Sequence, residues 1–148
     1  MSSKTPIAYI DIRLSAHATE DLDKVLEAIR NILPERSEAK ITFEKTQLTG
    51  HYGNEITLIE TKIQDKCVAQ ETFEKLSRGL SILDKEFLSS RLSEHLEKGN
   101  LYLRLDKQAA FLKEIKLGQV DPIHLRIHFK NSNQTEITTL CRKFGLIS

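Results

Sequence analysis

Strict alternation of apolar and polar residues marks three segments of the chain as β-strands. The clearest segment is 123–130 (IHLRIHFK), in which Ile123 and every second residue after it are apolar, whereas His124 and every second residue after it are polar. Segments 8–16 (AYIDIRLSA) and 101–105 (LYLRL) follow the same two-residue period. This period is typical of a strand with one face on a core, so we expect three half-buried strands with polar outward faces.

Two further segments are rich in β-branched residues and lie close together in the chain. They are 40–48 (KITFEKTQL) and 54–63 (NEITLIETKI), and the short stretch TGHYG joins them. β-Branched residues favour strands, and a short glycine-containing connection is typical of a hairpin. We therefore predict a β-hairpin in which Gly50 and Gly53 supply the backbone freedom of the turn.

Apolar residues spaced by three and four positions predict helices elsewhere. The first helix is expected to start with Thr19 as its N-cap and to end at Pro34. Between residues 66 and 98 two apolar stripes predict a pair of helices, with Ser81 capping the second. Segment 134–146 (QTEITTLCRKFGL) predicts a short closing helix.

The order of these elements predicts the fold class. A strand, a helix, two strands, two helices and then further strands, including a short one at 114–117 (EIKL), is an α+β order. Short connections favour a largely antiparallel sheet of four to six strands. We expect helices on one face of this sheet only, and a single domain that spans residues 1–148.

Composition fits a compact cytoplasmic protein. The chain has 148 residues, of which 39% are hydrophobic and 29% charged, and no apolar run is long enough to span a bilayer. The N-terminal segment lacks the features of a signal peptide. Two cysteines do not form a disulfide framework, and no CxxC or HExxH motif occurs. We therefore expect no metal and no cofactor.

Charge is unevenly distributed along the chain. The net charge is +1, but residues 1–100 carry 14 Lys and Arg against 17 Asp and Glu, and residues 101–148 carry 8 against 4. A basic face can bind polyanions even when the whole molecule is near neutral. The alternative is that these lysines and arginines are simply solvated.

The polar side chains of the three alternating strands form the main candidate site. These side chains are Tyr9, Arg13, Tyr102, Arg104, His124, Arg126, His128 and Lys130. If the strands share a sheet, cations and aromatic rings lie together on one surface, which suits contacts with phosphates and unpaired bases of RNA. The alternative is a solvated face in which arginines pair with Asp11 and Asp106.

A break in the strand pattern gives a second candidate. Asp106 is suited to cap a short helical turn, which places Lys107 in the first turn of that helix. A cation is unfavourable there unless an anion such as a phosphate binds. The alternative is that Asp106 already satisfies the free N–H groups and Lys107 points into water.

The hairpin loop gives a third candidate. His51, Tyr52 and Asn54 place an imidazole, a phenol and an amide between two glycines, where backbone can approach a ligand closely. Turn geometry alone explains the glycines and Asn54, but not His51 or Tyr52. Catalysis is not expected, because the chain lacks a nucleophile motif, and His124 and His128 would lie roughly 13 Å apart on their strand.

Three segments resemble a known family. GHYGNEITLIE (50–60), LYLRLDKQAAFL (101–112) and HLRIHFK (124–130) are similar to segments of small archaeal RNA-binding proteins described as predicted exosome subunits. The resemblance implies an α+β fold like that of a large-subunit ribosomal protein, and RNA binding without catalysis. By motif position it implies RNA contacts at His51, Tyr52, Asn54, Arg104, Lys107 and Gln108.

Two functional hypotheses follow. The first is a non-catalytic RNA-binding protein, an accessory of RNA processing or of the exosome, which contacts phosphates and bases through a basic sheet face and adjoining loops. The second is a protein-interaction or assembly module whose sheet face or edge strand pairs with another subunit. Their salt dependence separates them, since contacts with phosphates weaken steeply as salt rises.

Overall fold

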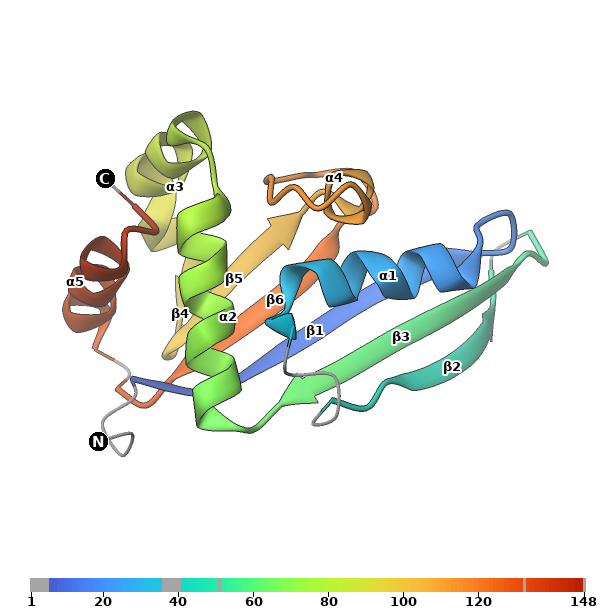
Figure 1. The fold of residues 1–148 in the computed structure, drawn as a ribbon, viewed down its shortest axis with the longest axis horizontal. Coiled ribbons are helices and arrows are strands. Elements are labelled where there is room, and N and C mark those ends of the chain that lie inside the picture. Colours follow the sequence, from blue (N-terminus) through green and yellow to red (C-terminus); the bar gives the residue numbers. More distant parts are fainter. Residues whose placement is uncertain (1–5, 36–40, 51, 132, 148) are drawn as a thin grey trace.

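The chain alternates between groups of strands and groups of helices (Figure 1). The structure, a computed structural model, describes residues 6–35, 41–50, 52–131 and 133–147. Its elements are β1 (Ile7–His17), α1 (Leu22–Ile32), β2 (Glu44–Thr49), β3 (Glu55–Ile63), α2 (Lys66–Gly79), α3 (Ile82–His95), β4 (Leu96–Glu97), β5 (Asn100–Leu105), α4 (Lys107–Phe111), β6 (Ile123–Phe129) and α5 (Gln134–Phe144). The predicted α+β class is confirmed.

Six strands form one open sheet in the order β2-β3-β1-β6-β5-β4. Every neighbouring pair is antiparallel. The longest strand, β1, lies between β3 and β6, which connects the N-terminal hairpin to the C-terminal strands. The predicted sheet of four to six largely antiparallel strands is therefore confirmed.

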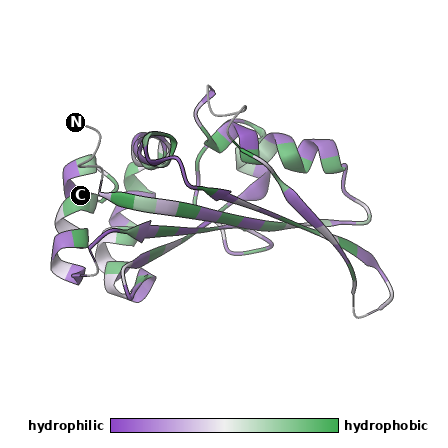
Figure 2. Cartoon of the chain, turned by 90° about the horizontal axis from the view of Figure 1, so that it is seen from below, coloured by the Kyte–Doolittle hydropathy of each residue, from purple (hydrophilic) through white to green (hydrophobic). Residues whose placement is uncertain are grey.

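The two-residue period divides the sheet into an apolar and a polar face, and Figure 2 shows the alternating colours along the strands. In β1, Ile10 and Ile12 are 0% and 1% exposed, whereas Asp11 and Arg13 point to the opposite face. Burying one such aliphatic side chain stabilises the fold by about 1.5–3 kcal/mol. A one-residue slip would move all of them to the polar face, so the apolar contacts fix the register.

Helices α1 and α2 lie across the apolar face (Figure 1). Phe73 of α2 is fully buried, and its ring packs edge-on against the rings of Phe129 of β6 and Phe144 of α5. The ring centroids are 5.8 Å and 5.2 Å apart, respectively. These contacts hold α5 against the end of the core.

Cys141 of α5 is buried, which raises the pKa of its thiol to about 12, and both cysteines are free.

Side-chain caps set the starts of the helices. Helix α1 starts after Asp21, whose carboxylate accepts a backbone hydrogen bond two residues further on, and not after Thr19 as predicted. The chain first makes a turn in which the Glu20 N–H donates to the His17 carbonyl at 2.9 Å. Ser81 caps α3, as predicted.

Among the described residues, no helix combines the length and apolar character needed to cross a membrane.

The predicted strand at 114–117 is wrong. Only one bridge forms there, between Leu117 and Leu105. The Leu117 N–H donates to the carboxylate of Asp84 at 3.1 Å, so it is not available for a strand ladder. This contact ties α3 to the connection between α4 and β6.

The second helix of the predicted pair ends before Lys98. Lys98 and Gly99 have positive φ angles of 51° and 83°, which reverse the chain immediately after β4. The reversal lets β4 pair with the start of β5. The sheet therefore gains a sixth, very short strand.

The one-sided core predicts unequal effects of two neighbouring substitutions on β5. Leu103 is 1% exposed on the apolar face, so Leu103→Ala should lower the free energy of unfolding by about 2–5 kcal/mol, through lost burial and the cavity left behind. Tyr102→Ala, on the polar face, should cost less than half as much because its ring is 40% exposed. Urea titration measures both, and equal losses would contradict a core on one side only.

Candidate functional site

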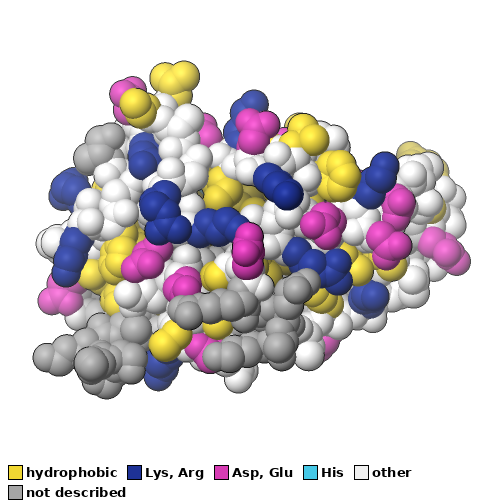
Figure 3. All heavy atoms as spheres, in the orientation of Figure 1, with side chains coloured by type: hydrophobic (Ala, Val, Ile, Leu, Met, Phe, Trp, Pro, Cys, Tyr) yellow, Lys and Arg dark blue, Asp and Glu magenta, His cyan; other side chains and the backbone are white. Residues whose placement is uncertain are grey.

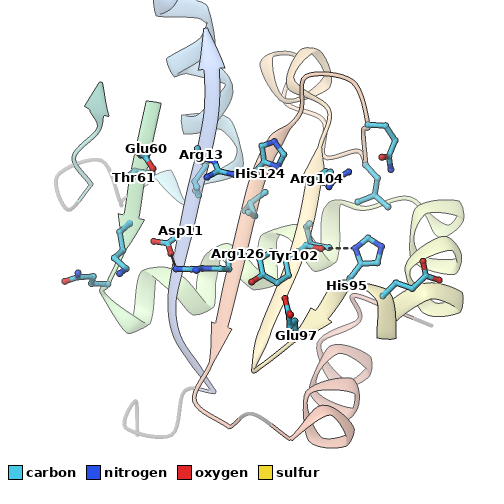
Figure 4. Close-up of a pocket in the computed structure, with 18 of the residues that line it drawn as sticks. Asp11, Arg13, Glu60, Thr61, His95, Glu97, Tyr102, Arg104, His124 and Arg126 are labelled. Atoms are coloured by element: carbon cyan, nitrogen blue, oxygen red, sulfur yellow. Dashed lines mark hydrogen bonds and ion pairs between the residues drawn. The ribbon is translucent and has the colours of Figure 1, made fainter. Parts of the chain in front are cut away.

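The polar face of the sheet is hollowed into a trough of about 1320 Å³ (Figure 4). Its floor consists of outward-facing side chains of β3, β1, β6 and β5. Helix α3 borders it with Phe87, Arg91 and His95, and the connection between α4 and β6 borders it with Leu117 and Gln119. We call this surface the polar trough. It is open to any ligand that approaches the sheet from the side away from α1 and α2.

Two arginines and a histidine form a row across three adjacent strands. The register places Arg13 of β1 opposite His124 of β6, and His124 opposite Arg104 of β5. Figure 4 shows the three side chains side by side. Both arginines are exposed, and within the described part of the chain neither side chain forms a hydrogen bond or a salt bridge. We call these three residues the cationic row.

The electrostatics of the cationic row favour an anion. Partial burial and the charges of Arg13 and Arg104 lower the pKa of His124, and the more distant Asp121 only partly offsets them. His124 is therefore neutral near pH 7, and the positive charges of Arg13 and Arg104 flank it. The register places Glu60 of β3 on the far side of Arg13, but no ion pair joins the two side chains. An anion placed between the arginines would relieve their repulsion and would favour protonation of the histidine.

A second row of side chains crosses the same strands. It contains Lys62, Asp11, Arg126 and Tyr102 in register. Arg126 Nη2 donates to the Asp11 carboxylate at 2.5 Å, and this hydrogen bond and the charge of Asp11 raise the pKa of Arg126. The expected arginine–aspartate pair therefore forms at this position. The neighbouring Tyr102 carries an exposed ring, and its carbonyl accepts a hydrogen bond from Nδ1 of His95 at 2.9 Å.

Tyr9 and His128 are paired across β1 and β6 outside the lining of the polar trough, and they contact each other. Their rings are stacked with centroids 4.7 Å apart and an interplanar angle of 23°. The ammonium of Lys62 lies 4.4 Å from the centroid of Tyr9, and Nδ1 of His128 lies 2.7 Å from the amide oxygen of Asn100. Internal contacts therefore occupy the Tyr9 ring, whereas Tyr102 has no aromatic neighbour among the described residues.

Carboxylates flank the polar trough on two sides. Glu44 and Glu60 face each other across β2 and β3, and Glu94 and Glu97 lie on α3 and β4. We call these four residues the acidic rim. Arg13, Arg126 and Arg104 lie between the two carboxylate pairs, on β1, β6 and β5. Lys and Arg are not confined to the polar trough, because Figure 3 shows them on the helical side too, interleaved with Asp and Glu.

Lys107 matches neither interpretation of its sequence, since its ammonium neither awaits a phosphate nor points into water. Asp106 caps α4 by accepting from the Ala109 N–H at 2.8 Å, as expected. The Lys107 ammonium turns inward, where it donates to the Ser15 carbonyl at 2.8 Å, to Glu20 at 3.1 Å and to Asp121 at 2.7 Å. All three of its protons are therefore engaged within the protein, and its side chain is only 12% exposed.

Two acceptors of Lys107, Glu20 and Asp121, belong to a grouping of potential metal ligands among the described residues. Ligand atoms of His17, Glu20 and Asp121 lie within 4.8 Å of one another. Lys107 already supplies the positive charge that a metal ion would bring to these carboxylates. Partial burial raises the pKa of Asp121, but the hydrogen bonds and charges of Lys107 and His17 outweigh this effect and lower it.

The hairpin-loop candidates lie away from the polar trough. Tyr52 is 86% exposed and Asn54 is exposed beyond the end of β2 and β3. The first residue of β3, Glu55, is five positions from Glu60 of the acidic rim, or roughly 16 Å along the strand. His51 lies outside the described residues.

Gln108 and Lys130 also lie outside the polar trough. Gln108 is exposed on α4. Lys130 follows β6, where its backbone N–H donates to the Pro6 carbonyl at 2.9 Å. It lies four residues from Arg126, or roughly 13 Å along the strand direction. The structure therefore brings together Arg13, Tyr102, Arg104, His124 and Arg126, and it separates them from the loop residues.

Sequence reasoning missed the contributions of β3 and α3. Lys62 occupies a polar position in its strand, but the sequence does not reveal that β3 lies next to β1. Phe87 belongs to the second of the two apolar stripes between residues 66 and 98, yet it is 37% exposed on the wall of the polar trough. A non-helical backbone at Arg91 (φ −127°, ψ 18°) accompanies a guanidinium placed 4.6 Å from the Phe87 centroid.

A family model described as RNA binding matches residues 9–129 of the chain. The chain is 37% identical over 133 residues to RNA-binding protein PAB1135 of Pyrococcus abyssi, covering 88% of this chain and 86% of the relative. It is 38% identical over 117 residues to the uncharacterized protein MJ0213 of Methanocaldococcus jannaschii, covering 76% and 78%. Both relatives are archaeal, as the sequence resemblance implied.

Solved structures support the fold. Mth689, a DUF54 protein from Methanothermobacter thermautotrophicus, superimposes with a TM-score of 0.77 at 28% identity, over 95% of this chain and 98% of that one. The likeness to a ribosomal protein stays a prediction.

The contacts of Lys107 predict a structural role that a stability measurement can detect. Lys107→Met keeps the aliphatic stem but removes the ammonium donor from the Glu20 and Asp121 carboxylates and from the Ser15 carbonyl. It should lower the free energy of unfolding by about 1.5–3 kcal/mol near neutral pH. The control is Lys113→Met, which removes an exposed lysine and should change stability little.

The loss of unfolding free energy caused by Lys107→Met should also depend on pH. The pKa of Asp121 is lowered in the folded protein, so its stabilising contribution is present above the unfolded value of 3.8 and fades as the pH falls below it. Urea titrations at neutral and acid pH should therefore show a smaller difference between Lys107→Met and the unmodified chain in acid. A neutral-pH loss no larger than that of the control would contradict the internal role of Lys107.

Proposed function

Because the chain belongs to the family described as RNA binding, we propose that it binds RNA in the polar trough and does so without catalysis. The observation that carries this proposal is the cationic row, in which Arg13 and Arg104 lie unpaired on an uncovered sheet face. Guanidinium groups bind phosphate with planar, bidentate hydrogen bonds. The row therefore supplies a place for a phosphate of the RNA backbone.

The phosphate would lie over His124, between the two arginines. In the free protein the like charges of Arg13 and Arg104 oppose each other across this histidine. A phosphate removes that repulsion and adds two charge-assisted contacts, so binding gains from both changes. His124 then becomes a third donor once it takes up a proton.

Arg126 and Tyr102 have different parts in the proposal. Arg126 is already neutralised by Asp11, so it contributes hydrogen-bonding capacity and shape more than net charge. The exposed ring of Tyr102 offers a surface on which a base can stack. Contacts with a phosphate and a stacked base are sequence-tolerant, which implies weak sequence preference.

The acidic rim limits the affinity. A protein that neutralises many phosphates binds tightly at low salt, but here the carboxylates leave room for only a few phosphate contacts. The net charge of +1 gives no strong long-range attraction either. We therefore expect modest affinity with a moderate salt dependence.

The wider setting is also part of the proposal. Residues 1–148 act as one RNA-binding domain in the cytoplasm, as an accessory of RNA processing or of the exosome. The family resemblance supports the link to RNA processing, and Lys130, His128 and the hairpin loop remain candidate contacts for longer RNA.

One observation favours a second candidate function. All six residues of the edge strand β2 are exposed, so its outer backbone groups are available for pairing with a strand of another protein. This would make the chain an assembly module. Strand addition relies on backbone hydrogen bonds and changes little with salt, unlike contacts with phosphates.

The cationic row predicts the effect of a double substitution. Arg13→Ala with Arg104→Ala removes the two unpaired charges, and it should weaken RNA binding at low salt by about tenfold or more. The slope of log K against log salt should also become shallower by about 0.7, since the two arginines share one phosphate and each phosphate contact on a single strand contributes about 0.7. Fluorescence anisotropy with labelled RNA at several salt concentrations measures both, and gel analysis of the same RNA checks that it stays intact.

The matched control removes the same charge from another part of the surface. Lys24→Ala with Lys143→Ala changes two exposed lysines on α1 and α5, and it should leave the affinity within about threefold and the salt slope nearly unchanged. If the control pair weakens binding as much as the arginine pair, RNA does not bind at the cationic row.

His124 predicts a pH dependence of binding. Its pKa is lowered in the free protein, and a bound phosphate raises it, so RNA binding takes up a proton. Affinity should therefore rise as the pH falls from about 7.5 to about 5.5, the range in which histidine titrates. An NMR titration of the His124 ring with and without RNA measures the shift directly. His124→Gln should flatten the pH profile, and an unchanged profile in this variant would contradict the role of His124.

A further inference from the structure

We propose that the polar trough holds an unpaired, single-stranded segment of RNA and does not bind an RNA duplex. This inference rests on the proposed function and names the form of RNA that the same site recognises. Three features of the trough carry it: its exposed aromatic rings, its single cationic row and its borders.

The aromatic rings are placed for unpaired bases. Tyr102 on the floor is 40% exposed and has no cation over its ring among the described residues. Phe87 on the wall is 37% exposed, and the guanidinium of Arg91 lies over its ring, 4.6 Å from the centroid, so the ring and the guanidinium form one stacking surface. Bases inside a duplex are already stacked on one another and cannot use such rings. A single strand can turn its bases out onto aromatic rings and guanidinium planes.

The spacing of phosphate and base contacts also fits one strand. Tyr102 and Arg104 are two residues apart on β5 and point to the same face, so they lie roughly 6.6 Å apart. One nucleotide could therefore place its phosphate at the cationic row while its base reaches Tyr102. The exposed ring and the unpaired guanidinium then contact the same nucleotide.

The charge distribution disfavours a second backbone. Arg13 and Arg104 provide one cationic track, bordered on one side by Glu44 and Glu60 of the acidic rim. The other two carboxylates of the rim border the trough beside α3. A duplex would bring a second line of phosphates toward one of these carboxylate pairs. Like charges repel, so this arrangement selects one strand over two.

The borders of the trough also favour a single strand over a duplex. Helix α3 and the connection that contains Leu117 and Gln119 rise beside the sheet. A double helix recognised by shape needs access to its broad minor groove, which these borders restrict. A flexible strand can follow the floor between them.

The test compares one RNA in two forms. An RNA of about 12 nucleotides with no internal pairing is titrated by fluorescence anisotropy alone and after annealing to its complement, within the usual site size of single-strand binders. We expect the single strand to bind at least tenfold more tightly than the duplex. Tyr102→Ala and Phe87→Ala should each weaken single-strand binding about fivefold or more, whereas Tyr102→Phe should bind nearly normally. Leu112→Ala, which truncates a 59% exposed side chain at the end of α4 outside the trough, is the control and should have little effect.

A second measurement does not depend on how the variants fold. The fluorescence of 2-aminopurine placed in the same RNA should be quenched when the unmodified protein binds, because the base stacks on a ring. Duplex binding as tight as single-strand binding would overturn the single-strand inference. If that duplex binding still depends on Arg13 and Arg104, the proposed function stands. Unquenched 2-aminopurine at every position would overturn the stacking contacts, and binding of neither form would overturn both proposals.

Discussion

The structure depends on one constraint, which is that an antiparallel sheet with a two-residue period is covered on one face only. Aliphatic residues of β1, β5 and β6 are buried against α1 and α2, so the polar residues between them must share the opposite face. The same packing that holds the core together therefore gathers Arg13, His124 and Arg104, which are far apart in the chain. Stability and the candidate site have a common origin, because a shift in register would bury the cations and expose the core.

Charge compensation then separates the structural cations from the available ones. Lys107 is enclosed by three acceptors and ties β1 to two connections. Arg126 is neutralised by Asp11. Arg13 and Arg104 lack such partners in the described part of the chain, so an external anion is their natural complement. The acidic rim confines that anion to the centre of the sheet.

The sequence predicted which segments form strands and helices better than it predicted which elements lie side by side. Alternation identified the strands with one buried face, because side-chain direction within a strand follows from its period alone. It could not place Lys62 beside Asp11, since strand order depends on how helices pack and connections run. The inward turn of Lys107 also needed tertiary structure, because its acceptors come from β1 and from the turns that contain Glu20 and Asp121. Phe87 followed a helical stripe but faces the trough, since α3 lies at the edge of the sheet and exposes part of that stripe.

The most direct test of the account is to locate bound RNA on the molecule by photo-crosslinking followed by mass spectrometry of the peptides. The account predicts crosslinks to peptides of β1, β5 and β6, with the strongest at Tyr102. Lysines and arginines also lie on the helical side (Figure 3), so that side is the natural competitor. Crosslinks confined to α1 and α2 would show that RNA binds behind the sheet, and would contradict the central claim.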